Sequence, residues 1–329
     1  MAIRRNGGGA LKIAVLDAGT LGEDVSLDAL KNYGELFTYE KTTPDAMSER
    51  VKDIDVLVLN KVRCNAETLK NANKLRLICI AATGYDNIDV AYCRSHGIAV
   101  CNVVGYSTES VAQLTLSMVF ALSTNLFAFH GYVADGSYMR SGVANSVTPV
   151  FHELTGKTWG ILGYGNIGKK VARVADAMGC RVIVSKQTPT KEDFPVVDLD
   201  TLCRESDILT VHTPLTDKTR GLLDRTHLAM MKKDAVLVNV ARGAVLDEKA
   251  VAEAVLNGAI GGFGCDVYTS EPFGENHPYK ALLGHSAVIL TPHMAWGSHE
   301  ARSRCIAEIA MNIASYLTGE KRNRVDLLV

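Results

Sequence analysis

Three polar side chains in the last third of the chain could together bind an anion and transfer a proton. Arg242 follows the apolar run AVLVNVA, Glu271 follows GFGCDVY, and His293 follows AVILT. Proline cannot continue a central strand, so Pro272 and Pro292 place the acid and the imidazole in loops at the rim of a sheet. Ligands of open parallel sheets bind beyond the carboxyl ends of the strands. We therefore expect a guanidinium, a carboxylate and an imidazole to converge there and to support hydride transfer.

A glycine-rich turn could bind the phosphates of a dinucleotide. It is a GxGxxG sequence that directly follows an apolar strand and opens a helical segment. The first glycine permits the tight turn, the second lets the backbone approach a pyrophosphate, and the helix N-terminus supplies N–H donors. A plain glycine-rich loop is the alternative, whereas a P-loop is excluded because Lys170 stands where a hydroxyl is needed. The six residues of the turn are Gly163, Tyr164, Gly165, Asn166, Ile167 and Gly168.

The residues after the next strand predict which dinucleotide is preferred. An NAD site usually places Asp or Glu about 20 residues beyond the glycines, where it bonds the ribose 2′-hydroxyl. Ser185 and Lys186 occupy that position here. A lysine and hydroxyls could hold a 2′-phosphate and no carboxylate is present to repel it, so NADP is favoured over NAD. The alternative is a solvated lysine beside an NAD site that uses other contacts.

Short apolar runs alternate with helical segments along the chain, which indicates parallel sheets built from βαβ units. Five strands are predicted first, at 11–17, 35–40, 55–60, 75–81 and 98–103. Six more follow, at 157–162, 181–185, 207–212, 235–241, 262–267 and 287–291. Helices are predicted at 45–52, 65–71, 107–128, 166–178 and 298–317. The pattern predicts two α/β units in series, joined by the long helix at 107–128.

Composition excludes several classes of protein. A chain of 329 residues is expected to form about two domains. The 35 Lys and Arg residues against 36 Asp and Glu give a net charge of −1, which offers no positive excess for nucleic acid or an anionic membrane. The 8 cysteines form no CxxC pair and none lies at zinc spacing from a histidine, so no metal site is expected. Single cysteines in apolar runs fit buried thiols in a reducing, cytoplasmic compartment.

Neither the N-terminus nor the longest apolar stretch has the pattern of an export or membrane segment. The start, MAIRRNGGGA, lacks an apolar core, so residues 1–10 are interpreted as a flexible leader rather than a signal peptide. Residues 111–129 are apolar but interrupted by polar side chains, among them Gln113, Ser117 and Asn125, which favours a buried helix over a membrane span.

Seven segments, in this order, resemble the D-isomer-specific 2-hydroxyacid dehydrogenases. They are AATGYDNID (81–89), GYSTESVAQLTLSMVFAL (105–122), GILGYGNIG (160–168), VHTPLT (211–216), VNVARGAVLDE (238–248), DVYTSEP (266–272) and TPHMAW (291–296). Within the family, GYSTESVAQ and HMAW are most similar to the hydroxypyruvate reductase, or glycerate dehydrogenase, branch. Formate dehydrogenases of the same superfamily carry Gln where this chain has Glu271, which argues against that activity.

The resemblance implies an architecture of two Rossmann-like, doubly wound parallel-sheet α/β domains with a cleft between them. The substrate domain is discontinuous, comprising residues 11–103 and 297–329. The dinucleotide-binding domain comprises residues 104–296. The resemblance also implies a homodimer formed largely by the dinucleotide-binding domains.

The resemblance further implies a role for each candidate residue. Arg242 binds the carboxylate of a 2-keto acid and polarises its carbonyl, and His293 donates the proton to the carbonyl oxygen. Glu271 accepts the other imidazole N–H and favours the charged ring. Backbone N–H groups of Thr83 and Gly84 complete the carboxylate pocket. Four further positions line the cofactor, the last near the nicotinamide amide: Thr108, Thr213, Ala241 and Asp266.

The predicted function is NAD(P)-dependent interconversion of a small 2-keto acid and a D-2-hydroxy acid, with hydroxypyruvate and glyoxylate as the expected substrates. The family's ribose-binding Asp is Lys186 here, which puts NAD specificity in doubt. One alternative is another dehydrogenase of the family, of the D-lactate or 3-phosphoglycerate type. The other is a non-catalytic, dinucleotide-sensing scaffold of the corepressor type, because one fold can carry different functions.

Overall fold

The computed structural model describes residues 10–187 and 192–328, which form two parallel sheets. The first sheet has the order β2-β1-β3-β4-β5, and the second has the order β11-β10-β9-β8-β6-β7. The strands of the first are β1 (Leu11–Val15), β2 (Gly34–Thr38), β3 (Val56–Leu59), β4 (Leu77–Ile80) and β5 (Ala99–Cys101). Those of the second are β6 (Thr158–Leu162), β7 (Arg181–Ser185), β8 (Ile208–Val211), β9 (Val236–Asn239), β10 (Gly262–Cys265) and β11 (Val288–Leu290). All eleven predicted strands are confirmed. The leader predicted at 1–10 lies, apart from Ala10, outside the described residues.

The chain divides into two compact units. Residues up to Ser107 and from Gly297 onward form unit 1, and Thr108–Trp296 form unit 2. The helix that was predicted to join the units, at 107–128, therefore lies almost wholly in unit 2. Because the chain returns to unit 1 only in its last helix, unit 1 is discontinuous in sequence.

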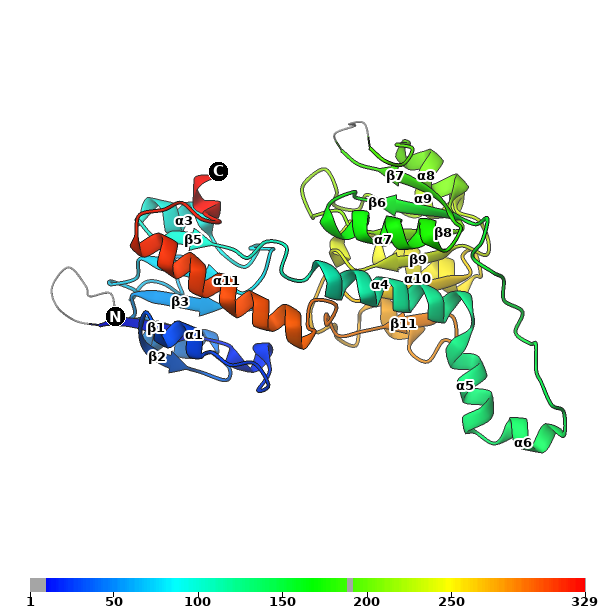
Figure 1. Ribbon diagram of the computed structural model, residues 1–329, viewed down its shortest axis with the longest axis horizontal. Helices are drawn as coiled ribbons and strands as arrows, with labels where there is room; N and C mark the ends of the chain where they lie inside the picture. Colours follow the sequence, from blue (N-terminus) through cyan, green and yellow to red (C-terminus); the bar gives the residue numbers. More distant parts are fainter. Residues whose placement is uncertain (1–9, 188–191, 329) are drawn as a thin grey trace. The chain divides into compact units, whose positions relative to one another are not determined.

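Helices cover both faces of the unit 1 sheet (Figure 1). The long C-terminal helix α11 (His299–Leu317) and the short α1 (Asp28–Lys31) lie on one face, where α11 contacts β4. The helices α2 (Pro44–Arg50) and α3 (Val90–Ser95) pack on the other face through Met47 and Cys93. Ser298 caps α11 by accepting the N–H of Ala301. The 3-10 helices η1 (Ala18–Leu21) and η4 (Val325–Leu327) complete this unit.

The unit 2 sheet is also enclosed by helices on both faces (Figure 1). On one side, α4 (Thr108–Ser123) and α7 (Asn166–Ala177) bury Val119 and Val171 against the strands. On the other side lie α8 (Leu199–Glu205), α9 (Arg225–Met230) and α10 (Glu248–Leu256). Two 3-10 helices, η2 (Gly243–Val245) and η3 (Pro278–Leu282), connect elements on that side. Enclosure of both faces explains why the strands are continuous apolar runs rather than alternating ones.

The helix predicted at 107–128 is not continuous, because α4 ends at Ser123 and a second helix begins at Leu126. The helix breaks at Asn125, whose φ of 53° is left-handed, and α4 and the following α5 (Leu126–Ala134) are bent by 66°. Asn tolerates this conformation better than most residues because its short side chain can bond locally. Neither α5 nor α6 (Ser137–Ser141), both fully described, contains a buried residue, so the expectation of a buried helix holds only for α4.

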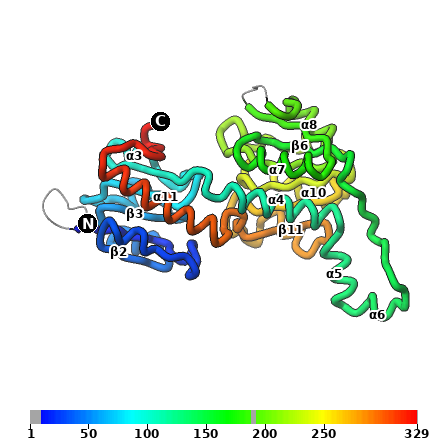
Figure 2. Tube along the Cα trace, viewed as in Figure 1, coloured from blue at the N-terminus to red at the C-terminus, as the bar shows by residue number. Residues whose placement is uncertain are grey.

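The segment 126–151 projects from the body of unit 2 as an arm (Figure 2). It comprises α5, α6 and an extended stretch without regular structure. Among the described residues no single helix is long and apolar enough to cross a membrane. The bent pair α4 and α5 reaches the necessary length and apolar composition only when the two helices are taken together.

The predicted helix at 65–71 is also wrong, since this segment forms successive turns. The side chain of Asn65 accepts the backbone N–H groups of Glu67 and Thr68, at 3.1 and 3.0 Å. A side chain that hydrogen-bonds to the nearby backbone competes with helix formation. The N–H groups of Lys70 and Ala72 bond to carbonyls three residues earlier, as in turns, rather than four residues earlier, as in an α-helix.

Candidate active site

Three neighbouring strands of unit 2 deliver the predicted catalytic residues to one edge of the sheet. In the register of the sheet, Cys265 of β10 pairs with Asn239 of β9 and with Leu290 of β11. Arg242 and His293 each follow three residues after their paired position. Parallel strands in this register end at the same level, so the loops that carry both side chains start from adjacent points.

The structure brings Glu271 and His293 into direct contact. Oε2 of Glu271 lies 2.6 Å from Nδ1 of His293, and the two side chains are 30% and 22% exposed. The other carboxylate oxygen of Glu271 accepts the N–H of Tyr268 at 3.0 Å. The indole of Trp296 donates to the backbone carbonyl of His293, whose φ of 52° is left-handed. The imidazole is therefore oriented through one ring nitrogen by an acid that is itself held by backbone.

The loop that carries His293 is fastened by Asp266. The carboxylate of this fully buried residue accepts the N–H groups of Met294 and Ala295, at 2.9 and 2.8 Å, and the hydroxyl of Thr291. Burial raises the pKa of Asp266, although these three donors and the nearby imidazole act in the opposite direction. In the structure the donors to Asp266 belong to the protein's own loop, while the predicted contact with a nicotinamide amide stays a prediction.

Arg242 stands at the start of η2, on the turn beside this loop. Its Nη1 donates to the carbonyl of Ala241 at 2.8 Å, and Asn239 holds the turn by accepting from Ala241 N–H and donating to the Arg242 carbonyl. Gly243 lies against the backbone of Tyr268, because a Cβ atom there would fall 2.2 Å from the Tyr268 carbonyl carbon. Arg242 is thus linked to the acid and imidazole through the peptide that follows Tyr268.

The glycine turn lies at the carboxyl end of β6, where the strand order reverses between β6 and β8. Gly163 has a φ of 95°, and a Cβ atom there would lie 2.5 Å from the backbone nitrogen of Thr213. Gly168 supports the turn from α7, where a Cβ atom would lie 2.3 Å from the Gly163 carbonyl oxygen. At Gly165, by contrast, no atom of the described residues other than its own chain neighbours lies within 4 Å of an added Cβ. A dinucleotide phosphate fits this arrangement, since the backbone at Gly165 and the α7 N-terminus are accessible.

The other residues of the turn differ in their surroundings. Asn166 and Ile167 form the first turn of α7. Tyr164 is only 6% exposed and packs edge-on against Phe194, with ring centroids 6.4 Å apart. Its ring thus contributes to the core of unit 2, while its predicted part in cofactor binding would fall to its backbone.

A carboxylate that the sequence interpretation missed lies at the end of β7. Glu192 forms an ion pair with Lys186, and its other oxygen lies 3.4 Å from Nζ of Lys169. Both Lys186 and Glu192 are largely buried, at 20% and 12% exposed, and Ser185 is buried beside them. The sequence argument that no carboxylate is present near the ribose position is therefore wrong. Only the residues directly after the strand were considered, whereas Glu192 returns from the loop that follows.

The remaining predicted residues are distributed over both units. Thr83, after β4 in unit 1, donates its hydroxyl to the Val103 carbonyl at 2.8 Å, and Gly84 follows it. Thr108 begins α4 in unit 2, and Thr213 is buried against the glycine turn. No group of three His, Cys, Asp or Glu side chains suited to a metal ion occurs within residues 10–187 and 192–328.

His212, after β8, is a second functional candidate that sequence reasoning passed over. Both of its ring nitrogens are buried, and neither has a hydrogen-bond partner in the described part of the chain. Burial lowers the pKa of His212 to about 3, so the ring is neutral at physiological pH. The available signal was a polar residue at a strand end, the same signal that identified His293.

Comparison with known proteins shows similarity to one family of dehydrogenases over most of the chain. Residues 116–295 match the family model described as D-isomer specific 2-hydroxyacid dehydrogenase, NAD binding domain. Over 317 residues the chain is 34% identical to a glycerate dehydrogenase from Methylorubrum extorquens, covering 96% of this chain and 99% of that one. It is 35% identical over 288 residues to a hydroxypyruvate reductase from Thermotoga maritima, covering 86% and 92%.

Solved structures show the same similarity. The fold matches a D-lactate dehydrogenase from Aquifex aeolicus, solved in complex with NAD and lactic acid, with a TM-score of 0.83. The two sequences are 26% identical, and the match covers 96% of this chain and 99% of that one. The predicted architecture of two parallel-sheet α/β domains is thereby confirmed.

Proposed function

The chain belongs to the D-isomer specific 2-hydroxyacid dehydrogenase family, and on that basis we propose that it reduces hydroxypyruvate or glyoxylate to the corresponding 2-hydroxy acid. It is an oxidoreductase that uses a nicotinamide dinucleotide. The observation that carries the proposal is the 2.6 Å contact between Glu271 and His293 at the sheet edge that also bears Arg242. A glycerate dehydrogenase and a hydroxypyruvate reductase among its relatives support this substrate class.

In the proposed mechanism, His293 is the proton donor. Because Nδ1 is bonded to Glu271, the proton would pass from Nε2 to the carbonyl oxygen of the substrate. The Glu271 carboxylate fixes the tautomer of the ring and stabilises its charged form before transfer. A bound reduced nicotinamide supplies the hydride.

Arg242 is proposed to bind the substrate carboxylate. A planar guanidinium offers two parallel donors to a carboxylate, and one of them can polarise the adjacent carbonyl. The backbone N–H groups of Thr83 and Gly84 are proposed as further donors to the same carboxylate. These assignments explain why a 2-keto acid, with a carboxylate next to its carbonyl, suits the residues available.

A kinetic comparison tests the proposal. Purified protein is assayed for NADPH and NADH oxidation with hydroxypyruvate, glyoxylate, pyruvate and 3-phosphohydroxypyruvate. His293→Gln should lower kcat by about 10²- to 10⁴-fold, the usual range for a general acid, with an unchanged dinucleotide Kd. Arg242→Gln should in addition raise the KM of the keto acid. Tight NADPH binding with no turnover of any keto acid would instead favour a dinucleotide-sensing scaffold.

For the cofactor, the proposal is a preference for NADP. Lys186, directly after β7, and Lys169, on α7, provide two cations beside Glu192, and a 2′-phosphate would compete with Glu192 for both. Lys186→Asp should therefore shift preference toward NADH. Glu192→Gln should lower the KM of NADPH several-fold and leave that of NADH unchanged. If neither variant alters the ratio of the two cofactors, these side chains do not recognise the 2′ position.

The proposed assembly is a homodimer in which the arm contacts the second copy. The arm exposes many large apolar side chains, a concentration that a monomer rarely presents to water. They are Leu126, Phe127, Val133, Met139, Val143, Val147, Val150 and Phe151.

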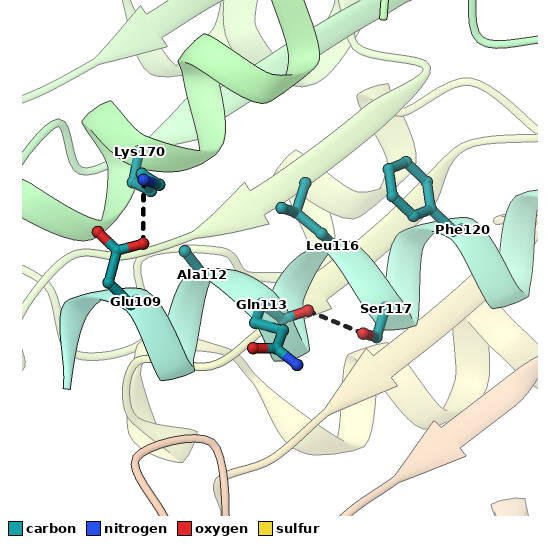
Figure 3. Close-up of a pocket in the computed structure, with 7 residues that line it drawn as sticks. All are labelled: Glu109, Ala112, Gln113, Leu116, Ser117, Phe120 and Lys170. Carbon is teal, nitrogen blue, oxygen red and sulfur yellow. Dashed lines mark hydrogen bonds and ion pairs between the residues drawn. The ribbon is translucent and has the colours of Figure 1, made fainter. Parts of the chain in front are cut away.

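A hollow on the outer face of α4 offers a place for such apolar side chains to dock. Figure 3 shows Ala112, Leu116 and Phe120 along the helix, with an ion pair between Glu109 and Lys170 at one end. The hollow has a volume of about 320 Å³. It lies on the helix that leads directly into the arm.

Sedimentation velocity tests the assembly. Met139 and Val147 are 79% and 75% exposed, so Met139→Glu with Val147→Glu should yield monomers without unfolding the chain. Leu283→Glu is the matched control, since Leu283 is 60% exposed in unit 2 but outside the arm. A wild-type chain that sediments as a monomer would contradict the proposal.

The compartment proposed is the cytoplasm. All 8 cysteines are buried and none is in a disulfide. Unpaired cysteines in this number suit a reducing environment.

A further inference from the structure

A buried acid behind the catalytic loop bonds the peptide that supports it. Glu248 is the first residue of α10, and its side chain is 7% exposed. Its Oε1 accepts the backbone N–H of Thr269 at 2.8 Å, and its Oε2 accepts the hydroxyl of the same residue. The carboxylate therefore accepts hydrogen bonds from both the backbone and the side chain of one loop residue.

A buried imidazole lies on the other side of this acid. Nε2 of His277 is 2.9 Å from Oε2 of Glu248, at an angle unsuited to a hydrogen bond, and the His277 side chain is 6% exposed. Tyr279 donates its backbone N–H to Nδ1 of His277, and the rings of Phe273 and Tyr279 flank the imidazole. The acid is enclosed by protein, so its bonds to Thr269 are shielded from water and correspondingly strong.

The backbone of Tyr268 and the Tyr268–Thr269 peptide that follows it contact the two parts of the proposed catalytic group. The N–H of Tyr268 donates to Glu271, which orients His293. The phenol of Tyr268 also bonds the carbonyl of Thr291, two residues before His293. Gly243, next to Arg242, packs against the same peptide, with an added Cβ falling 2.4 Å from the Thr269 nitrogen. A displacement of this peptide would move the acid and the guanidinium together.

We infer that Glu248 is a positioning residue for the reaction, acting through Thr269 to set the place of Glu271 relative to Arg242. The inference depends on the proposed function for its kinetic readout, but not for its spectroscopic one. A misplacement of about 1 Å at reacting groups can cost about 10²-fold in rate, so a distant anchor of this kind has a measurable effect.

Kinetics of matched variants separate positioning from simple stabilisation. Glu248→Ala should lower kcat 10- to 100-fold with an unchanged dinucleotide Kd. Asp247→Ala is the control, because Asp247 caps the same helix by accepting the backbone N–H of Ala250 at 3.0 Å. It should weaken the fold while leaving kcat near the wild-type value. Equal kcat values in the two variants would overturn the inference.

A milder pair of variants tests the same contact in case Glu248→Ala does not fold. Thr269→Val removes only the hydroxyl that Glu248 accepts and should lower kcat several-fold. Thr269→Ser restores a hydroxyl and should return kcat close to wild type. If Val and Ser variants behave alike, the hydroxyl contact has no positioning role.

A spectroscopic readout keeps the inference testable if no keto acid is turned over. Side-chain ¹⁵N NMR of histidine reports the tautomer, and the signal of His293 is identified by its loss in His293→Gln. In the wild type the ring should be held with its proton on Nδ1, facing Glu271. In Glu248→Ala the signal should become an average of both tautomers. An unchanged tautomer in that variant would overturn the inference, whereas absent turnover in the wild type would count only against the proposed function.

Discussion

The two sheets share a strand order but differ at the point where that order reverses. Unit 1 has the order β2-β1-β3-β4-β5, and unit 2 has the equivalent order β7-β6-β8-β9-β10, with β11 added at one edge. In each unit the chain crosses from one side of its first strand to the other. The reversal therefore lies between β1 and β3 in unit 1, and between β6 and β8 in unit 2. Parallel sheets bind ligands beyond the strands at such a point.

In unit 1 the chain itself fills this position with an anion. Asp17 follows β1, is 5% exposed, and accepts the N–H groups of Asn60, Lys61 and Val62 at distances between 2.6 and 3.3 Å. Burial raises the pKa of Asp17, while these bonds act in the opposite direction. In unit 2 the glycine turn with the open Gly165 stands in the equivalent place. Backbone N–H donors at such a point are therefore not sufficient for an anion-binding site. In unit 1 the N–H groups of residues 60–62 already donate to the carboxylate of Asp17.

The largest effect is expected from the two glycines at the unit 2 reversal. Gly163→Val combines a left-handed φ with a clash against backbone, and we expect a loss of about 4 kcal/mol or more in unfolding free energy. Gly165→Val has open space, so its unfolding free energy should stay near wild type while the Kd for NADPH rises at least about 10-fold. Urea unfolding and fluorescence titration measure the two quantities. If Gly165→Val keeps wild-type affinity, the phosphate does not bind at this turn.

The second prediction concerns the internal anion of unit 1. Asp17→Ala leaves the buried N–H groups of residues 60–62 without their acceptor, which should cost about 3 kcal/mol in unfolding free energy. The affinity for NADPH should not change, because Asp17 belongs to unit 1. Urea unfolding and NADPH titration at pH 7 check both parts. A stability equal to wild type would show that the amides find other acceptors.

The third prediction uses the imidazole after β8. The pKa of His212 is lowered from 6.5 to about 3 in the folded chain, so between these values the unfolded state binds more protons and stability falls with acid. At pH 5, 1.5 units below the unfolded pKa, this costs about 2 kcal/mol relative to pH 7. His212→Leu should lack that loss. Urea unfolding of both proteins at pH 7 and pH 5 gives the difference, in which other titrating groups cancel. Parallel pH profiles would mean that the His212 ring is not held neutral by the fold.

The strands and the convergence of Glu271 with His293 could be predicted from the sequence because their signals are local. Both sheets consist of short apolar runs, and Pro272 and Pro292 mark where the loops of Glu271 and His293 leave the sheet. The helix break at Asn125 could not be predicted in the same way, since the apolar pattern continues through it into a segment that the fold leaves exposed.

The residues that were missed act through contacts that the spacing of strand ends does not reveal. Glu192 reaches Lys186 from a loop, and Glu248 reaches Thr269 across 21 residues. Both are acids that composition alone would assign to the surface. Only the folded chain shows that they are enclosed, so spacing rules based on strand ends do not find them.

The smallest effect is expected from an exposed carboxylate of unit 1, which tests whether burial or contact makes Asp17 important. Asp53 lies 2.5 Å from Nζ of Lys74, as close as any amide is to Asp17, but both side chains are more than half exposed. The pKa of Asp53 is lowered chiefly by its hydrogen bond to Lys74. Water solvates both charges when the pair is broken, so Asp53→Asn should move the thermal unfolding midpoint by no more than about 2 °C. Differential scanning calorimetry of Asp53→Asn beside Asp17→Ala makes the comparison directly. If Asp53→Asn shifts the unfolding midpoint as much as Asp17→Ala does, then a short contact stabilises the fold equally well whether the carboxylate is exposed or buried. Burial would then not explain the importance of Asp17.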